Sequence, residues 1–197
     1  YLTYEAAVNN APGTLDAFAH IAANGYISSD RVALIFKQQN IQGETGYSFG
    51  SIINMPDTST VALRFVPYHP IIGYKDWEMN RDNIITYNLH TRHVDANLFL
   101  HNDVSSLKLF TRHNEADTTQ EAVTLQLSDI KIQDWLAINP FAPSIQGDLS
   151  ADMSFSWTEK SIDGAGTLTL ADFMYDRQRV GTFTFDTKAQ TRGGIVN

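Results

Sequence analysis

Residues 149–157 read Leu-Ser-Ala-Asp-Met-Ser-Phe-Ser-Trp, and apolar and polar residues alternate along the whole stretch. Successive side chains of a β-strand point to opposite faces, so this alternation predicts a strand with one buried and one solvated face. Residues 180–187 repeat the pattern, with Phe183 and Phe185 on the apolar side. Further alternating runs bring the total to roughly ten predicted strands; they lie at residues 32–36, 47–53, 61–65, 94–100, 107–109 and 123–127.

The connections between these runs predict how the strands pair. They are short and polar, as at Asn24-Gly25 and Asp163-Gly164, which favours antiparallel neighbours. A helical pattern is confined to residues 134–139, where Asp134 is placed to cap the turn and Pro140 to end it. We therefore expect an all-β protein, mainly antiparallel, built as an elongated, curved sheet or a half-open sandwich with one short helical turn.

One internal repeat is readable in the sequence. Residues 125–132 (LQLSDIKI) and residues 168–175 (LTLADFMY) share Leu-x-Leu-x-Asp followed by a large apolar residue. In both copies the alternation changes parity at the aspartate, Asp129 or Asp172, as happens when a β-bulge inserts one extra residue. The repeat predicts two strands that bend at the same point, and it favours a modest repeat architecture.

Composition bounds the class of protein. The chain has 197 residues, of which 43% are hydrophobic and 18% charged, so it can bury a core. We predict one β-rich domain over residues 1–197, with possible sub-units 1–118 and 119–197 joined by a polar loop near 114–120. The net charge of −8 opposes binding to nucleic acid, and no apolar run is long enough to span a bilayer. Without cysteine, thiolate chemistry is excluded.

Candidate catalytic and metal sites are weak. Gly46-Tyr47-Ser48-Phe49-Gly50 matches the nucleophile-elbow pattern of serine hydrolases, but the β-branched residues and proline that follow do not form the helix that this mechanism needs. We interpret Ser48 as an outward-facing strand residue. His90 and His93 lie three residues apart and would face opposite sides of a strand, which disfavours a shared metal ion. The sequence therefore predicts no catalytic residue, no metal and no cofactor.

Two stretches resemble the TamB and AsmA family of envelope proteins, in particular the TamB-like proteins of Bacteroidetes. The first comprises residues 61–67 and the junction Trp77-Glu78-Met79-Asn80-Arg81-Asp82-Asn83-Ile84. The second comprises the Leu-x-Leu strand at 124–132, Asp134-Trp135-Leu136, a Gly-Asp-Leu-Ser strand start at 147–150 and the Gly-x-Leu-x-Leu-x-Asp strand at 166–172. The resemblance covers roughly residues 60 to 190.

The resemblance implies an internal fragment of a long, non-enzymatic periplasmic protein, tethered to the inner membrane through a segment absent from this chain. Its stacked strands would form an apolar groove for phospholipid transport between the two membranes or for outer-membrane protein assembly. The implied partners are phospholipid acyl chains, adjacent repeats of the same chain and an outer-membrane assembly protein. The residues expected to line the groove are Leu149, Met153, Phe155, Trp157, Leu168, Leu170, Phe183 and Phe185.

Two other classes of function remain open from the sequence. Tyr74 and Trp77 lie next to the acidic residues Asp76, Glu78 and Asp82, a mixture that is also found in sugar-binding sites. A carbohydrate-binding β-sandwich is therefore an alternative, and it requires an exposed Trp77. The third possibility is a hydrolase that uses Ser48.

Overall fold

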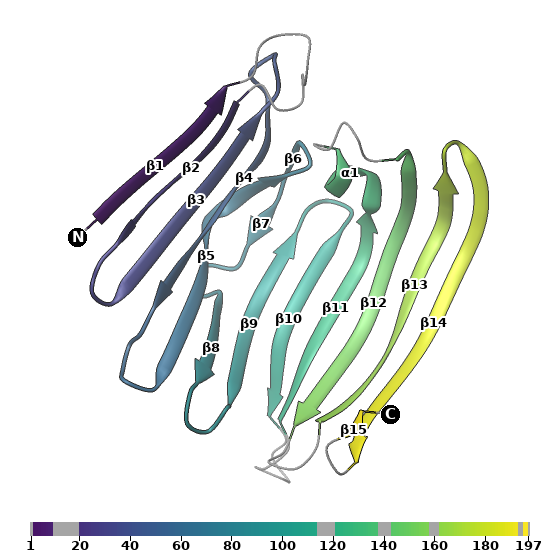
Figure 1. Cartoon of the computed structure of the whole chain (residues 1–197). Helices are drawn as coiled ribbons and strands as arrows, with labels where there is room; N and C mark the ends of the chain where they lie inside the picture. Colours follow the sequence, from purple (N-terminus) through teal and green to yellow (C-terminus); the bar gives the residue numbers. More distant parts are fainter. Residues whose placement is uncertain are drawn as a thin grey trace.

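Almost all of the described chain is β-sheet (Figure 1). The computed structural model describes residues 2–9, 20–113, 121–137, 143–157, 162–192 and 195–196. The one helix in these residues is the short α1 (Ile132–Leu136). The strands are β1 (Leu2–Asn9), β2 (His20–Ile27), β3 (Arg31–Gln39), β4 (Thr45–Asn54), β5 (Thr60–Ile72), β6 (Lys75–Asp76), β7 (Glu78–Met79), β8 (Ile84–Asn88), β9 (Val94–His101), β10 (Ser106–His113), β11 (Glu121–Lys131), β12 (Ile145–Trp157), β13 (Ile162–Tyr175), β14 (Gln178–Arg192) and β15 (Ile195–Val196).

The strands form one open antiparallel sheet in which chain order and spatial order agree. Along the sheet the order is β1-β2-β3-β4-β5-β8-β9-β10-β11-β12-β13-β14-β15, while the short β6 and β7 pair with β5 and β9. Each long strand therefore pairs with its neighbours in sequence, as short polar connections require. The predicted all-β, mainly antiparallel fold is confirmed. The polar loop predicted near 114–120 lies outside the described residues.

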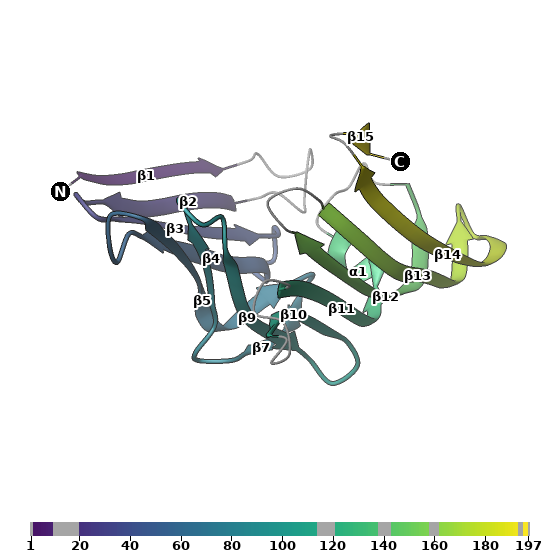
Figure 2. The ribbon, with the colours of Figure 1, turned by 90° about the horizontal axis from the view of Figure 1, so that it is seen from below.

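The sheet is bent across its strands into a trough. Seen from below in Figure 2, β1–β3 rise on one side and β12–β14 on the other, with β9–β11 between them. Side chains of non-neighbouring strands pack together in a cluster of Tyr47, Ile72, Trp77, Leu100 and Ile130, with Phe36, Met79, Leu107, Leu127 and Leu149 around it. Tyr47 of β4 and Ile130 of β11 belong to strands that are separated in the sheet order by β5, β8, β9 and β10, so their side chains can join one cluster only across the concave face. The apolar face of the sheet is thus the concave one.

The two predicted bulges are present and are equivalent. Asp129 and Asp172 have positive φ angles of 50° and 48°. The register of β11 with β12 shifts between Leu127 and Ile130, and that of β13 with β14 shifts between Leu170 and Phe173. Each bulge sets two residues opposite one, so the apolar residues after the aspartate return to the concave face. This explains the change of parity in the sequence repeat.

The helical turn differs from its prediction. It was expected at residues 134–139 with Asp134 as the cap, but α1 begins at Ile132 and ends at Leu136. Asp134 lies inside its first turn, and the N-cap residue, Lys131, makes no side-chain capping hydrogen bond. The helix is held instead by tertiary contacts, because the Trp135 ring packs edge-on against Trp77 at 6.1 Å between centroids. Residues 138–139 lie outside the described residues.

In the Trp77–Ile84 junction, asparagine side chains make hydrogen bonds to the backbone of β5 and β9 in place of a paired strand. Asn83 is 1% exposed, and its amide oxygen accepts from Phe65 N at 2.7 Å. Its amide nitrogen donates to the carbonyl oxygens of Phe65 at 3.2 Å and Asn80 at 3.0 Å. Asn80 Oδ1 accepts from Phe99 N at 2.8 Å. The two asparagine side chains therefore provide hydrogen-bond partners for backbone groups of β5 and β9 at a place where no strand pairs with them.

The bulge geometry predicts the effect of substitutions at Asp129. Replacing Asp129 by Val should lower the free energy of unfolding by about 1–2 kcal/mol, because a β-branched residue is strained at positive φ. The matched variant Asp129→Asn should be close to wild type, since asparagine tolerates this conformation. Urea denaturation measures both. Equal stability of the Val and Asn variants would contradict the bulge.

The junction predicts a larger effect at Asn83. Asn83→Ala should destabilise the protein by about 2–3 kcal/mol, because it leaves buried backbone groups of Phe65 without partners. Asn102 is half-buried, and its side chain accepts from Val104 N at 2.9 Å within a turn. It provides the control variant Asn102→Ala, which should lose less stability. Thermal unfolding followed by circular dichroism compares them, and similar losses for both variants would refute this role of Asn83.

Candidate functional site: an apolar trough

The residues expected to line a groove share one face of the second half of the sheet. The register places Leu149 opposite Leu170, and Leu170 opposite Phe183. One step along, Ala151 faces Leu168 and Leu168 faces Phe185. Met153 and Phe155 follow on the same face of β12 because they continue its alternation. Trp157 has the same parity, but its side chain lies outside the described residues.

Strands β9 to β11 continue this face toward the middle of the sheet. Leu100 pairs with Leu107 and Leu98 with Leu109, and both leucines of β10 then pair with Leu127 and Leu125 of β11. These two leucines face Ala151 and Met153 of β12. None of the described trough-facing side chains in β9–β12 carries a charge.

The first half of the sheet contributes an equivalent face, which sequence reasoning did not assign to the site. Ile53 pairs with Val32 on one side and Leu63 on the other. Val32 pairs with Ile27, which in turn pairs with Leu2 at the edge. The alternation at residues 32–36 and 47–53 already carried this signal. What the sequence did not show is that these strands face β9–β12 across the trough.

Many large apolar side chains of the trough are only partly covered. Eleven of them are 38% to 62% exposed: Leu2, Val8, Ile27, Val32, Leu34, Phe49, Ile53, Tyr87, Phe155, Phe183 and Phe185. Complete burial of such a side chain contributes about 1.5–3 kcal/mol to stability. A side chain that stays about 40% exposed therefore lacks about 1 kcal/mol of this contribution. Together they forgo about 10 kcal/mol, which is comparable to the whole stability of a typical domain. Monomeric soluble proteins rarely expose so many large apolar side chains on one face.

The two ends of the trough differ. At the α1 end the apolar side chains in the middle of the sheet are buried, with Leu100 at 6%, Ile130 at 5% and Trp77 at 2% exposed. Toward the rims the same rows end in Val8 and Phe183, which are 60% and 38% exposed. Here the Tyr47 hydroxyl of β4 donates to the Trp135 carbonyl of α1, which joins the two halves of the sheet. Gly73 lies directly against the backbone of Asp134, where a Cβ would sit 1.8 Å from its carbonyl oxygen. The α1 end is therefore closed by packed protein.

Phe155 shows how the trough wall is shaped. A Cβ on Gly164 of the neighbouring strand would lie 3.0 Å from a ring carbon of Phe155, so the ring rests over the glycine. On the next strand the Phe183 ring contacts Phe173 at 5.8 Å and Phe185 at 6.5 Å between centroids. Phe173, Phe183 and Phe185 thus form one aromatic group on β13 and β14, and Phe155 lies apart from it, in register with Gly164 and Ala189.

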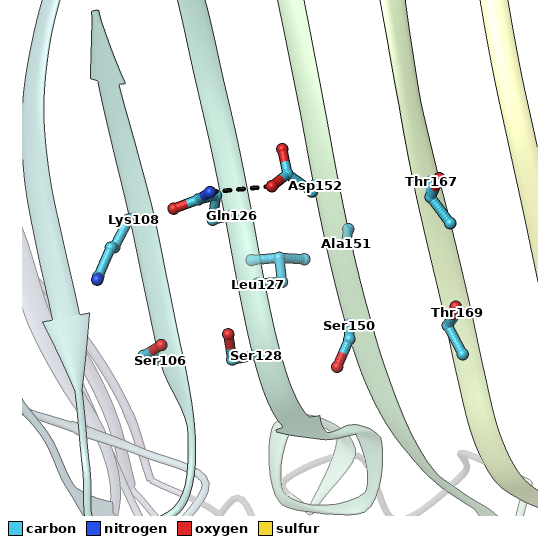
Figure 3. A pocket seen from close by; sticks show the side chains of 10 residues that line it. All are labelled: Ser106, Lys108, Gln126, Leu127, Ser128, Ser150, Ala151, Asp152, Thr167 and Thr169. Atoms are coloured by element: carbon cyan, nitrogen blue, oxygen red, sulfur yellow. Dashed lines mark hydrogen bonds between the residues drawn. The ribbon is translucent and has the colours of Figure 1, made fainter.

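The opposite face of the same strands is polar. It carries a shallow hollow of about 360 Å³, which Figure 3 shows in close-up. The side chains that point to it are hydroxyls, amides and a few charges, and Gln126 Nε2 donates to Asp152 Oδ2 at 2.9 Å. The lining comprises Ser106, Lys108, Gln126, Leu127, Ser128, Ser150, Ala151, Asp152, Thr167 and Thr169. Strands β11–β13 thus have one polar and one apolar face.

The other candidate sites of the sequence do not assemble. Ser48 lies in the interior of β4, a strand that runs on to Asn54, so its Gly-x-Ser-x-Gly frame is extended rather than a strand–turn–helix elbow. Trp77 is 2% exposed and cannot serve as a platform for a sugar ring, which corrects the premise of the carbohydrate-binding alternative. Within the described residues, no group of three or more His, Asp or Glu side chains is arranged to hold a metal ion.

Comparisons with protein-family models, with curated proteins and with solved structures found no match to this chain. They provide no link to the TamB and AsmA family, and that resemblance stays a prediction. In the part of the chain that the structure describes, no helix has the length and apolar content to cross a bilayer.

The closed end generates a prediction about pH. Burial, and to a lesser extent the carboxylate of Asp134, raises the pKa of Tyr47 to about 12. An unfolded tyrosine has a pKa of about 10, so the stability that the protonated hydroxyl contributes is complete below pH 10 and is lost as the pH rises through about 12. Tyr47→Phe should lower stability by about 1 kcal/mol at pH 7 and should reduce the further loss between these two values.

Urea denaturation at a series of pH values measures this effect. Tyr175→Phe is the control, because Tyr175 is 51% exposed and lies outside the contacts that close the α1 end. Identical pH profiles for wild type and Tyr47→Phe would contradict the closed end described above.

Proposed function

We propose that the trough binds the acyl chains of phospholipids. The observation that carries this proposal is the set of eleven half-exposed apolar side chains on the concave face, opposite a polar outer face. A phospholipid chain would cover these side chains and recover the free energy that they forgo in water. A soluble polar ligand would recover none of it.

The dimensions and the chemistry of the trough fit such a ligand. β11 has 11 residues and spans about 36 Å, whereas the acyl region of one bilayer leaflet is about 15 Å thick. None of the described trough-facing side chains of β9–β12 is charged, so a ligand needs no charged group to bind there. Uniform aliphatic and aromatic lining favours a linear hydrocarbon without selecting a particular head group.

We further propose that the chain is a non-enzymatic segment of a TamB- or AsmA-like periplasmic protein that carries phospholipid between the inner and outer membranes or assists outer-membrane protein assembly. The support is the resemblance over residues 60–190, together with the structural roles of its motifs. The bulged Leu-x-Leu-x-Asp strands keep the trough apolar, and the Trp77–Ile84 junction joins β5 to β9. An outer-membrane assembly protein is the expected partner.

The proposal predicts a face-specific loss of lipid binding. The pair Phe155→Asp and Phe183→Asp should weaken binding of a fluorescent fatty acid at least tenfold, because it places two carboxylates in the trough. The matched pair Ser154→Asp and Thr184→Asp lies on the same two strands and faces outward, so it adds the same charge without touching the trough. This control should bind like wild type.

Mass spectrometry of the purified protein under native conditions provides the second readout. The wild type and the outward-facing pair should carry phospholipid, and the Phe155 and Phe183 pair should not. Circular dichroism confirms that each variant is folded. A folded wild type that binds neither phospholipid nor fatty acid would refute the proposal, as would equal loss of binding in the two pairs.

A further inference from the structure

Eight of the eleven half-exposed apolar side chains of the trough form two separate groups, one in each half of the sheet. The members on β2–β4 are 39% to 42% exposed and comprise Ile27, Val32, Leu34, Phe49 and Ile53. The members on β12–β14 are 38% to 54% exposed and comprise Phe155, Phe183 and Phe185. We call these groups the β2–β4 wall and the β12–β14 wall. Between them, the described trough-facing side chains of β9–β11 are all buried or half-buried.

The two walls differ in length. Val32 of β3 pairs with both Ile27 and Ile53, and β2, β3 and β4 each have a paired strand on both sides. The exposure of this wall is therefore toward the trough and not at a strand edge. From Ile53 to Phe49 it extends four residue steps, or about 13 Å. The rings of the β12–β14 wall span six register positions of β13, from Gly164 to Leu170, which is about 20 Å.

One acyl chain is too short to lie on both walls. From β4 the sheet order passes through β5, β8, β9, β10 and β11 to β12, so the walls are six strand-to-strand steps, or about 29 Å, apart along the sheet. The acyl region of one bilayer leaflet is only about 15 Å thick. The curvature of the sheet nevertheless sets the two walls opposite each other (Figure 2), and Phe36 and Leu149 from the two halves pack against the same buried cluster. A ligand with two linked chains fits this arrangement.

We propose that the trough selects lipids with two acyl chains and holds one chain on each wall. This inference rests on the proposed function and adds the class of lipid. A single chain lies on the β12–β14 wall, because only this wall is longer than the chain. The β2–β4 wall holds the second chain. A diacyl lipid thus covers exposed apolar area on both walls, whereas a single-chain lipid leaves the β2–β4 wall in water.

The head group takes no part in this selection. Strands β2–β4 and residues 149–155 of β12 present no charged side chain to the trough. The walls therefore bind hydrocarbon, and a charged head group stays in water, where its solvation is retained. Selection is by the number of acyl chains, so two lipids with the same head group provide the test.

Displacement of a fluorescent fatty acid measures this selection. Didecanoyl phosphatidylcholine and decanoyl lysophosphatidylcholine share the head group and the chain length, and both are kept below their critical micelle concentrations. The wild type should bind the diacyl lipid about tenfold more tightly or better. Ile53→Asp places a carboxylate in the β2–β4 wall and should remove this preference, because the diacyl lipid loses about tenfold in affinity and the lysolipid less than about threefold. The milder variant Ile53→Asn should reduce the preference in the same direction.

A charge on the other face of the same strand provides the control. Ser48 of β4 pairs with Lys37 on the outer face, so Ser48→Asp adds the same charge and should keep the wild-type preference. Circular dichroism establishes that each variant is folded. Equal affinity of the wild type for the two lipids would overturn the inference, as would an Ile53→Asp variant that weakens both lipids equally or neither. In these cases the fatty acid still binds and the proposed function stands. A wild type that binds no fatty acid would refute the proposed function itself, so the two failures are distinguishable.

Discussion

The structure depends on keeping one face of a long meander apolar from the first strand to the last. Alternation does this within a strand, but a strand that changes parity would turn its apolar residues outward. The bulges at Asp129 and Asp172 remove this problem, because each inserts one residue at positive φ and returns Ile130 or Phe173 to the concave face. Without them the upper parts of β11 and β13 would expose their apolar residues to water.

A single-layer sheet must still cover its apolar face, and this one does so unevenly. Near α1, the two halves of the sheet meet through the cluster around Trp77, and the Tyr47–Trp135 hydrogen bond ties β4 to the helix. Away from α1 the halves are joined through β8, which pairs with β5 and β9, and residues such as Ile53 and Phe155 are about 40% exposed. The packed cluster near α1 thus supplies stability that permits other parts of the concave face to remain partly uncovered.

The elements that could be predicted from the sequence are those determined by residues close together along the chain. The strands follow from alternation, and the bulges follow from the parity change beside an aspartate, a residue that tolerates positive φ. The start of α1 was missed because it depends on tertiary contacts: Tyr47 and Trp135 are 88 residues apart. The burial of Trp77 was equally hidden, since the helix that covers it lies far along the chain. The trough face of β1–β4 was visible as alternation, but its position opposite β9–β12 required the curvature of the sheet.

The central claim is that the concave face, and not the outer face, meets hydrocarbon. Site-specific photocrosslinking tests it most directly, with a photoreactive phenylalanine analogue placed at Phe155 in one protein and at the adjacent Ser154 in another. After irradiation with a diacyl phospholipid, mass spectrometry should find the protein labelled at position 155 to be heavier by one lipid, and the protein labelled at position 154 to be unchanged. Equal crosslinking at the two positions, or none at 155, would contradict the account.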